Sequence, residues 1–267
     1  MPELPDVELF HRLVRDRCRG RRIAAANIPD AGILQGISAE SLARRLKGER
    51  LASSRRHGKY LFILLDGAGA LAMHFGTNGA LKLQSRSEED PVYTRLLLRF
   101  DDGERLAYVN PRRIGRVSLC ENPEAFVRDA GLGPDVLDAA FDLGAFTTSL
   151  GAGTRSIKSV LMDQARMAGI GNIYADEILF QAGLHPALPA RRVTGESALR
   201  LFRAMHKTLE TAIRCGVGAE QAVGRLPKSF LLPHRHKGGR CPRCGTLLVT
   251  VRESGRTGYY CPHCQPG

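Results

Sequence analysis

The sequence predicts an α+β protein, and three observations lead to that prediction. The first half holds short apolar runs separated by Gly, Asp and Asn. The second half spaces its apolar residues as helices do, and two Cys-x-x-Cys pairs stand near the C-terminus. With 267 residues, 43% of them hydrophobic, the chain is long enough for two domains with buried cores.

The first half is expected to be rich in β-strands. Its apolar runs recur at a spacing of roughly 8–12 residues, which is typical of a β-sandwich or a barrel. The expected strands are 22–28, 51–56, 60–65, 70–74, 94–100, 105–109 and 115–119. Two helices interrupt them: one begins at Pro5 and stops near Gly20, and the other covers 39–47, with Ser38 as its N-cap and Gly48 as its stop.

Beyond about residue 125 the periodicity becomes helical. Amphipathic helices are expected over 156–167, 173–182 and 196–214. Between the first two lies Gly169-Ile170-Gly171, which is too rich in glycine to continue a helix and short enough to force a tight reversal. A linker over 218–240, rich in Gly, Pro and basic residues, then leads to the cysteine pairs.

The charge balance points to a polyanionic partner. The chain carries 39 Lys and Arg against 27 Asp and Glu, a formal net charge of +12, and clustered cations gain affinity by releasing the counterions of phosphates. The alternative is a charge that serves only solubility or ribosome association. The longest apolar run, 60–65, is far too short to span a membrane, and the acidic N-terminus does not resemble a secretory signal. We therefore expect an intracellular, cytoplasmic protein.

The four patterned cysteines predict a structural zinc site. Cys241 and Cys244 form one pair and Cys261 and Cys264 the other, and the sixteen residues 245–260 separate them, which suits a hairpin between two zinc knuckles. Four thiolates leave no open coordination position, so we expect one Zn²⁺ ion with a structural role. The remaining cysteines, Cys18, Cys120 and Cys215, are expected to be buried or inert thiols.

The glycine turn allows two interpretations. A helix, two tight turns and a second helix direct backbone N–H groups outward, an arrangement that suits a phosphate, with Asn172 as the N-cap of the second helix. The alternative is a plain helical hairpin in which Asn172 only caps.

The N-terminus offers a nucleophile. When the initiator Met is trimmed, Pro2 becomes a free secondary amine, and an α-amino group is partly neutral at physiological pH. A neutral amine can attack a sugar C1′ to give an iminium ion, and the adjacent Glu3 is placed to act as a general acid. Position alone supports this only weakly, because a Met-Pro start usually has no such meaning.

Five segments together resemble the formamidopyrimidine-DNA glycosylase and endonuclease VIII family. The resemblance covers almost the whole chain, in order, and the combination of the N-terminal motif with the cysteine-rich tail is specific. The segments are Pro2-Glu3-Leu4-Pro5-Asp6-Val7-Glu8, Gly58-Lys59-Tyr60-Leu61, Asn110-Pro111-Arg112-Arg113, 169–177 and 255–265.

The resemblance implies a fold and an activity. The expected domains are an N-terminal catalytic β-sandwich flanked by helices (1–125), a helical helix-two-turn-helix DNA-binding domain (126–234) and a four-cysteine zinc finger (235–267). Family members flip a damaged base out of bent duplex DNA, excise it and cut the strand as AP lyases. A monomer that acts on double-stranded DNA with a damaged base or an abasic site is expected.

The resemblance also assigns roles to residues. Pro2 would form the Schiff base, Glu3 would protonate the sugar ring oxygen, and Lys59 and Arg256 would grip phosphates and donate protons during β,δ-elimination. Arg112 would fill the space left by the flipped base. The DNA contacts implied in total are His74, Arg112, Arg113, Lys158, Gly171 and Asn172.

Several residues depart from the family pattern. Asp6 stands where Glu is usual, Thr77 where the oxidised-guanine enzymes have a methionine wedge, and Ile114 where they have phenylalanine. Asp90-Pro91-Val92-Tyr93 replaces a histidine-rich segment, and 218–239 is short for a loop that caps an oxidised purine. The expected substrates are ring-opened or oxidised purines (formamidopyrimidine, 8-oxoguanine). The alternatives are an endonuclease VIII-like preference for oxidised pyrimidines or bulkier adducts, and a zinc-finger protein that binds damage without cutting.

Overall fold

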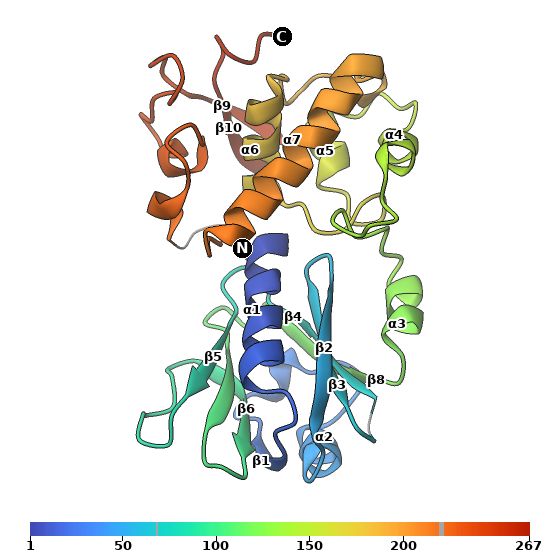
Figure 1. The fold of residues 1–267 in the computed structure, drawn as a ribbon, viewed down its shortest axis with the longest axis vertical. Coiled ribbons are helices and arrows are strands. Elements are labelled where there is room, and N and C mark those ends of the chain that lie inside the picture. The colour runs from blue at the N-terminus through green and yellow to red at the C-terminus, as the bar shows by residue number, and fades with distance from the viewer. Residues whose placement is uncertain (68, 219–221) are drawn as a thin grey trace. The chain divides into compact units, whose positions relative to one another are not determined.

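The computed structural model describes residues 1–67, 69–218 and 222–267 (Figure 1). The chain divides into two compact units. The first comprises residues 1–2 and 7–130, and the second comprises residues 3–6 and 131–267.

The first unit is built on two four-stranded antiparallel sheets. One has the strand order β1-β6-β7-β5 and the other β2-β3-β4-β8. The strands of the first sheet are β1 (Ile23–Asn27), β5 (Ala80–Gln84), β6 (Thr94–Phe100) and β7 (Arg105–Val109), and those of the second are β2 (Leu51–His57), β3 (Tyr60–Leu65), β4 (Ala70–His74) and β8 (Arg116–Cys120).

The two sheets share one apolar core. Ile23, Leu98 and Leu106 of the first sheet pack in the same buried cluster as Leu61 and Leu71 of the second. Helices α1 (Leu4–Arg17) and α2 (Ala39–Leu46) add apolar side chains to this cluster, and Ser38 caps α2 as predicted. The prediction of a β-sandwich flanked by helices is confirmed (Figure 1).

Strand β5, helix α3 and a short 3₁₀ helix at 31–33 were not expected from the sequence. Strand β5 is short and alternates apolar and polar residues, and it pairs with β7. Helix α3 (Pro123–Asp129) begins with Asn122, whose side chain accepts from the backbone N–H groups of Glu124 and Ala125, and has proline in its first turn. An N-cap followed by proline is a start signal for a helix, so the sequence did carry this information.

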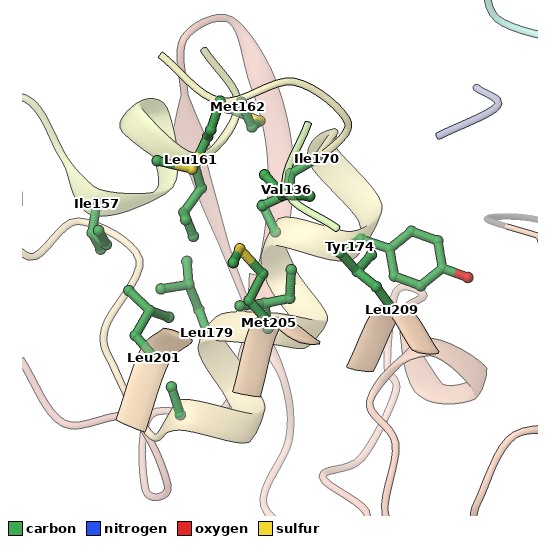
Figure 2. Close-up of a cluster of buried hydrophobic side chains, with 14 of the residues drawn as sticks. Val136, Ile157, Leu161, Met162, Ile170, Tyr174, Leu179, Leu201, Met205 and Leu209 are labelled. Carbon is green, nitrogen blue, oxygen red and sulfur yellow. The ribbon is translucent and has the colours of Figure 1, made fainter. Parts of the chain in front are cut away.

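The second unit is helical. Its helices are α4 (Leu143–Leu150), α5 (Ile157–Leu161), α6 (Asn172–Ala182) and α7 (Gly195–Arg214). Their apolar faces meet in one core, in which Leu161 of α5, Leu179 of α6 and Leu201, Met205 and Leu209 of α7 are fully buried (Figure 2). Helices α6 and α7 match the predicted segments, whereas α4 was not expected.

The predicted helix over 156–167 is wrong beyond Leu161. Helix α5 ends there, and the chain turns twice before α6 begins. Gln164 stabilises these turns, because its Nε2 donates to the carbonyl oxygens of Met162 and Ile170 while its Oε1 accepts from the Gly169 N–H. A side chain that satisfies backbone groups in this way competes with helix formation.

A two-stranded hairpin, β9 (Val249–Glu253) and β10 (Arg256–Tyr260), separates the cysteine pairs as predicted. The turns of the unit include short 3₁₀ helices at 190–192, 223–225 and 232–234. Of the segment that was considered short for a capping loop (218–239), residues 219–221 lie outside the described residues. In the described ranges, no helix has both the length and the apolar character that crossing a membrane requires.

The environments of Cys18 and Cys120 are consistent with inert thiols. Cys18 is fully buried, and burial raises the pKa of its thiol to about 11. Burial also raises the pKa of Cys120.

Candidate active site and nucleic-acid interface

The carboxylate of Glu3 is clamped by the start of helix α6. It accepts from the backbone N–H groups of Gly171 and Ile173, each at 2.8 Å, and of Tyr174 at 3.1 Å. Glu3 is fully buried, and an anion at a helix N-terminus also interacts favourably with the helix dipole. The sequence neighbour of Pro2 is thus fixed in position by residues about 170 positions away in the chain.

In this structure the Gly171 N–H has a partner within the chain, and the phosphate contact predicted for it stays a prediction. The glycine turn does bind an anion, but the anion is the Glu3 carboxylate of the same chain. A Cβ at Gly171 would lie 2.4 Å from Cδ and Oε1 of Glu3, so only glycine leaves room for it.

Asn172 is not the N-cap of α6. Gly171 occupies that position with extended backbone, and Asn172 is the first helical residue. Its Nδ2 donates to the carbonyl oxygen of Thr257 at 2.9 Å, which ties α6 to β10. The cap that Asn172 was expected to provide comes from Glu3. The role of Asn172 in DNA binding stays a prediction.

Lys158 also has a partner within the chain. It is fully buried, and its Nζ lies 2.6 Å from Oδ1 of Asp176, which is equally buried. A buried cation requires a partner of this kind, because transfer from water to the interior is costly for an unpaired charge. Lys158 thus has an internal partner in this structure, and its role in DNA binding stays a prediction.

Asp176 joins the zinc hairpin to the helices. Besides Lys158, its carboxylate accepts from the backbone N–H of Tyr259 at 2.9 Å and from Nε of Arg235 at 2.8 Å. Sequence reasoning did not single out Asp176 or its neighbour Glu177. The signal was available, because two acids within the otherwise apolar stretch 173–180 indicate buried, partnered carboxylates.

Glu177 anchors the segment that leads to the zinc finger. Its carboxylate accepts from the backbone N–H groups of Leu231 at 3.1 Å and Leu232 at 2.7 Å, and from Nε2 of Gln181 at 2.7 Å. Burial raises the pKa of Glu177 to about 7, against the lowering effect of these hydrogen bonds.

Arg256 is exposed at the tip of the zinc hairpin. It follows a tight turn in which Ser254 and Gly255 both have positive φ, as a two-residue hairpin turn of type I′ requires. The hairpin docks on α5 through the pairs Ser156–Glu253 and Ser159–Ser254. Arg256 Nη1 lies 4.0 Å from the sulfur of Met162, beside the two turns.

The four predicted ligands converge on one point. The Sγ atoms of Cys241, Cys244, Cys261 and Cys264 all lie within 4.8 Å of one another. A tetrahedral site with Zn–S bonds of about 2.3 Å places its sulfurs about 3.8 Å apart, and the Cys241–Cys264 and Cys244–Cys261 distances are 3.8 and 3.5 Å. The residues therefore fit a four-thiolate zinc ion, whose chemistry is structural.

In the first unit, Lys59 and His74 lie close together. Lys59 lies in the two-residue turn between β2 and β3. His74 is the last residue of β4, where it pairs with Tyr60 of β3 on one side and with Arg116 of β8 on the other. Burial and the charges of Lys59 and Arg116 lower the pKa of His74 to about 4. In the absence of DNA, His74 is thus neutral at physiological pH.

The loop between β7 and β8 presents Arg112 and Arg113. Both are exposed, but Arg113 Nε is paired with Asp30 at 2.7 Å, whereas no described residue pairs with Arg112. Of the two, Arg112 is the side chain available to enter a duplex. Pro2, the predicted nucleophile, is partly exposed and belongs to this same unit.

Comparison with protein families identifies all three segments of the chain. Residues 1–117 match the formamidopyrimidine-DNA glycosylase N-terminal domain, 132–223 match the helix-two-turn-helix domain of the same glycosylase, and 238–267 match a zinc finger found in this glycosylase and in isoleucyl-tRNA synthetase.

Relatives and solved structures agree with the family match. The formamidopyrimidine-DNA glycosylase of Carboxydothermus hydrogenoformans is 35% identical over 99% of this chain and 100% of its own length, and that of Moorella thermoacetica is 37% identical over 94% and 95%. The Lactococcus lactis enzyme bound to DNA with an abasic site superposes with a TM-score of 0.88 at 26% identity, covering 99% of this chain and 100% of that one. Its complex with N7-benzyl-Fapy-dG DNA gives 0.89 at 26% identity, with 100% of both chains covered. The chain therefore belongs to the formamidopyrimidine-DNA glycosylase family.

Proposed function

We propose that this base-excision-repair DNA glycosylase removes ring-opened and oxidised purines from duplex DNA and cuts the strand through a Schiff base at Pro2. The observation that supports this most directly is the clamp on Glu3. Three backbone N–H groups fix a buried carboxylate at the residue covalently next to the candidate amine. The same contacts cap helix α6, so the clamp stabilises the fold and also fixes an acid beside the candidate amine.

The proposed chemistry has three stages. The amine nitrogen of Pro2, freed by removal of Met1, attacks C1′, the bond from C1′ to the base breaks, and the amine proton leaves with the base. Glu3 protonates the ring oxygen O4′, and the sugar opens to an iminium ion. Loss of the C2′ proton then breaks the C3′–O bond and loss of the C4′ proton breaks the C5′–O bond, after which water hydrolyses the iminium ion and releases Pro2.

Other residues are proposed to bind the DNA. Lys59 and Arg256 would hold phosphates and transfer protons in the elimination steps, and Arg112 would occupy the space of the flipped base. Asn172 and His74 would add polar contacts. We keep the functional division into a catalytic domain (1–125), a helix-two-turn-helix domain (126–234) and a zinc finger (235–267), acting as a monomer on double-stranded DNA.

Borohydride trapping tests the nucleophile. The protein, with Met1 removed and verified by intact mass, is incubated with an abasic-site duplex and borohydride, and the adduct is mapped by mass spectrometry. We expect the adduct on Pro2. The matched control carries a short N-terminal extension that blocks the amine, and it should give none. An adduct at Lys59, or an equal yield from the blocked control, would overturn the assignment.

Lesion preference is tested by single-turnover excision from duplexes with ring-opened guanine, 8-oxoguanine or an oxidised pyrimidine. The DNA complexes of the structural relatives contain Fapy-dG lesions, and we expect the ring-opened purine to be released fastest here. Thr77 and Ile114 give a specific reason to retain the endonuclease VIII-like preference as the second candidate. Faster release of the oxidised pyrimidine would favour that candidate. Family membership decides against a protein that binds damage without catalysis.

A further inference from the structure

Three loops of the first unit are held together by one buried residue. Asn110 is fully buried, and its Nδ2 donates to the carbonyl oxygen of Phe75 at 3.1 Å. Its backbone N–H donates to the carbonyl oxygen of Tyr93 at 3.0 Å, and its own carbonyl accepts from Arg95 Nε at 2.9 Å. The loops after β4, before β6 and after β7 therefore have fixed positions relative to one another.

These loops expose large apolar side chains. Val92 is 74% exposed, Tyr93 54% and Ile114 53%. Thr77, on the loop after β4, is small and only partly exposed, and its hydroxyl oxygen is buried. The prominent apolar surface of the three loops thus lies on the β5–β6 loop and at Ile114.

Tyr93 adopts a backbone conformation that is unfavourable for a bulky side chain. Residues 91–94 form a turn closed by a hydrogen bond from the Thr94 N–H to the Pro91 carbonyl oxygen, and Tyr93, at its third position, has a φ of +66°. Such a turn favours glycine or asparagine there. A bulky residue held at positive φ and exposed to solvent indicates that its side chain serves a purpose outside the fold.

Arginine side chains surround Tyr93, and one of them lies against its ring. The guanidinium of Arg95 lies 5.9 Å from the ring centroid, and Asp30 holds both Arg95 and Arg113, at 3.1 and 2.7 Å. The register of β6 shifts directly after Tyr93, between Thr94 and Leu96, and such bulges often re-aim side chains at functional sites. With Arg112 also exposed, the apolar tip is bordered by arginines, which suits a polyanion and not an apolar protein surface.

We propose that Tyr93 is a DNA-probing residue, whose ring stacks on a base step of the duplex while Arg112 and Ile114 act beside it. This proposal rests on the proposed function and adds a specificity-determining residue to it. Aromatic and apolar side chains that enter a base step unstack it, and a damaged or mispaired base unstacks most easily. Tyr93 would therefore assist excision of the base and would not be needed once the base is absent.

A single-tryptophan variant tests the stacking. The chain contains no tryptophan, so Tyr93→Trp provides the only indole emission. We expect this emission to be quenched when a duplex with an abasic-site analogue binds. The control is Ala25→Trp, on an exposed position of β1 opposite Arg99, far along β6 from Tyr93, and its emission should barely change. Binding without quenching at position 93 would overturn the proposal.

Rate measurements test the role in recognition. Because the turn favours glycine, Tyr93→Gly should fold at least as stably as the wild type, and we expect single-turnover excision of a damaged base to fall about tenfold, the size of one lost stacking contact. Tyr93→Phe should retain the wild-type rate. Cleavage of a preformed abasic site should be unchanged in both variants. Wild-type excision by Tyr93→Gly would contradict the proposal, whereas failure of the proposed function would show separately, as absent borohydride trapping by the wild-type protein.

Discussion

At the residue scale, the carboxylate of Glu3 fits closely among the backbone groups at the start of α6. Glu3 satisfies three backbone donors at once, and the absence of a side chain at Gly171 makes the approach possible. The same turn would look like an ordinary glycine-rich reversal if the N-terminal residues were ignored. Its specific requirement is space for the acid that neighbours the nucleophile.

Gly171→Ala should therefore displace Glu3. The new Cβ would lie 2.4 Å from the carboxylate carbon, so we expect excision to fall by at least about 100-fold, the usual size of a lost general acid, while zinc content and circular dichroism stay unchanged. The measurement is single-turnover excision. Gly153→Ala is the matched control, because nothing lies within 4 Å of its Cβ. Equal rates in both variants would show that the clamp does not position the acid.

At the element scale, α6 organises the second unit. One of its ends holds Glu3, while Asp176 binds the zinc hairpin and Glu177 holds the chain at Leu231 and Leu232. Two successive buried acids on one helix thus fix two segments that are distant in sequence. The stability of these segments therefore depends on the charges of the two carboxyl groups, Asp176 and Glu177.

Glu177 predicts a pH dependence of stability. Its pKa is raised to about 7 in the folded protein, so the unfolded chain releases this proton first as the pH rises. The contribution to stability is present below about pH 4.5 and is lost as the pH passes about 7. In urea unfolding from pH 5 to 8, the stability of the wild type relative to Glu177→Gln should fall by roughly 2–3 kcal/mol. Parallel stability curves for the two proteins would refute this assignment.

Removal of zinc should loosen the packing of the β9–β10 hairpin against helix α6. Phe180 of α6 packs with Leu231, Cys241 and Cys261 in a small cluster of its own, too small to hold the hairpin without the metal. A strong chelator should therefore release one zinc ion per chain and weaken binding to an abasic-analogue duplex by more than tenfold. The sandwich should keep its β-type circular dichroism. Full binding by zinc-free protein would contradict the structural role.

Local sequence signals predicted most elements, because they depend on periodicity and caps. Strands β3, β4, β6 and β7 and the Ser38 cap follow their local patterns. The helix ending at Leu161 was misjudged because Gln164, five residues before Gly169, satisfies the turn by side-chain contacts that periodicity does not reveal. The partners of Gly171 and Lys158 could not be predicted either. Both depend on residues more than fifteen positions away, which only the fold brings into contact.

At the scale of the whole molecule, the excess of twelve positive charges should appear as a salt dependence. Affinity for an abasic-analogue duplex should fall linearly in log–log form between 50 and 200 mM salt, at a slope set by the number of phosphates neutralised. Arg256→Gln should reduce that slope by about 1, because Arg256 is exposed and is proposed to hold a phosphate. Arg44→Gln, on an exposed position of α2, is the control and should leave the slope unchanged. Equal slopes for both variants would remove Arg256 from the proposed phosphate contacts.

The Glu3 clamp also has a consequence for protein synthesis. The N-terminus leaves the ribosome first, but Gly171, Ile173 and Tyr174, which bury Glu3, are made about 170 residues later. At bacterial and eukaryotic elongation rates of 5–20 residues per second, Glu3 stays without these partners for roughly 9–34 s. During that interval an aminopeptidase has access to Met1, and its removal creates the amine at Pro2. Formation of the proposed nucleophile would thus precede completion of the fold that encloses Glu3.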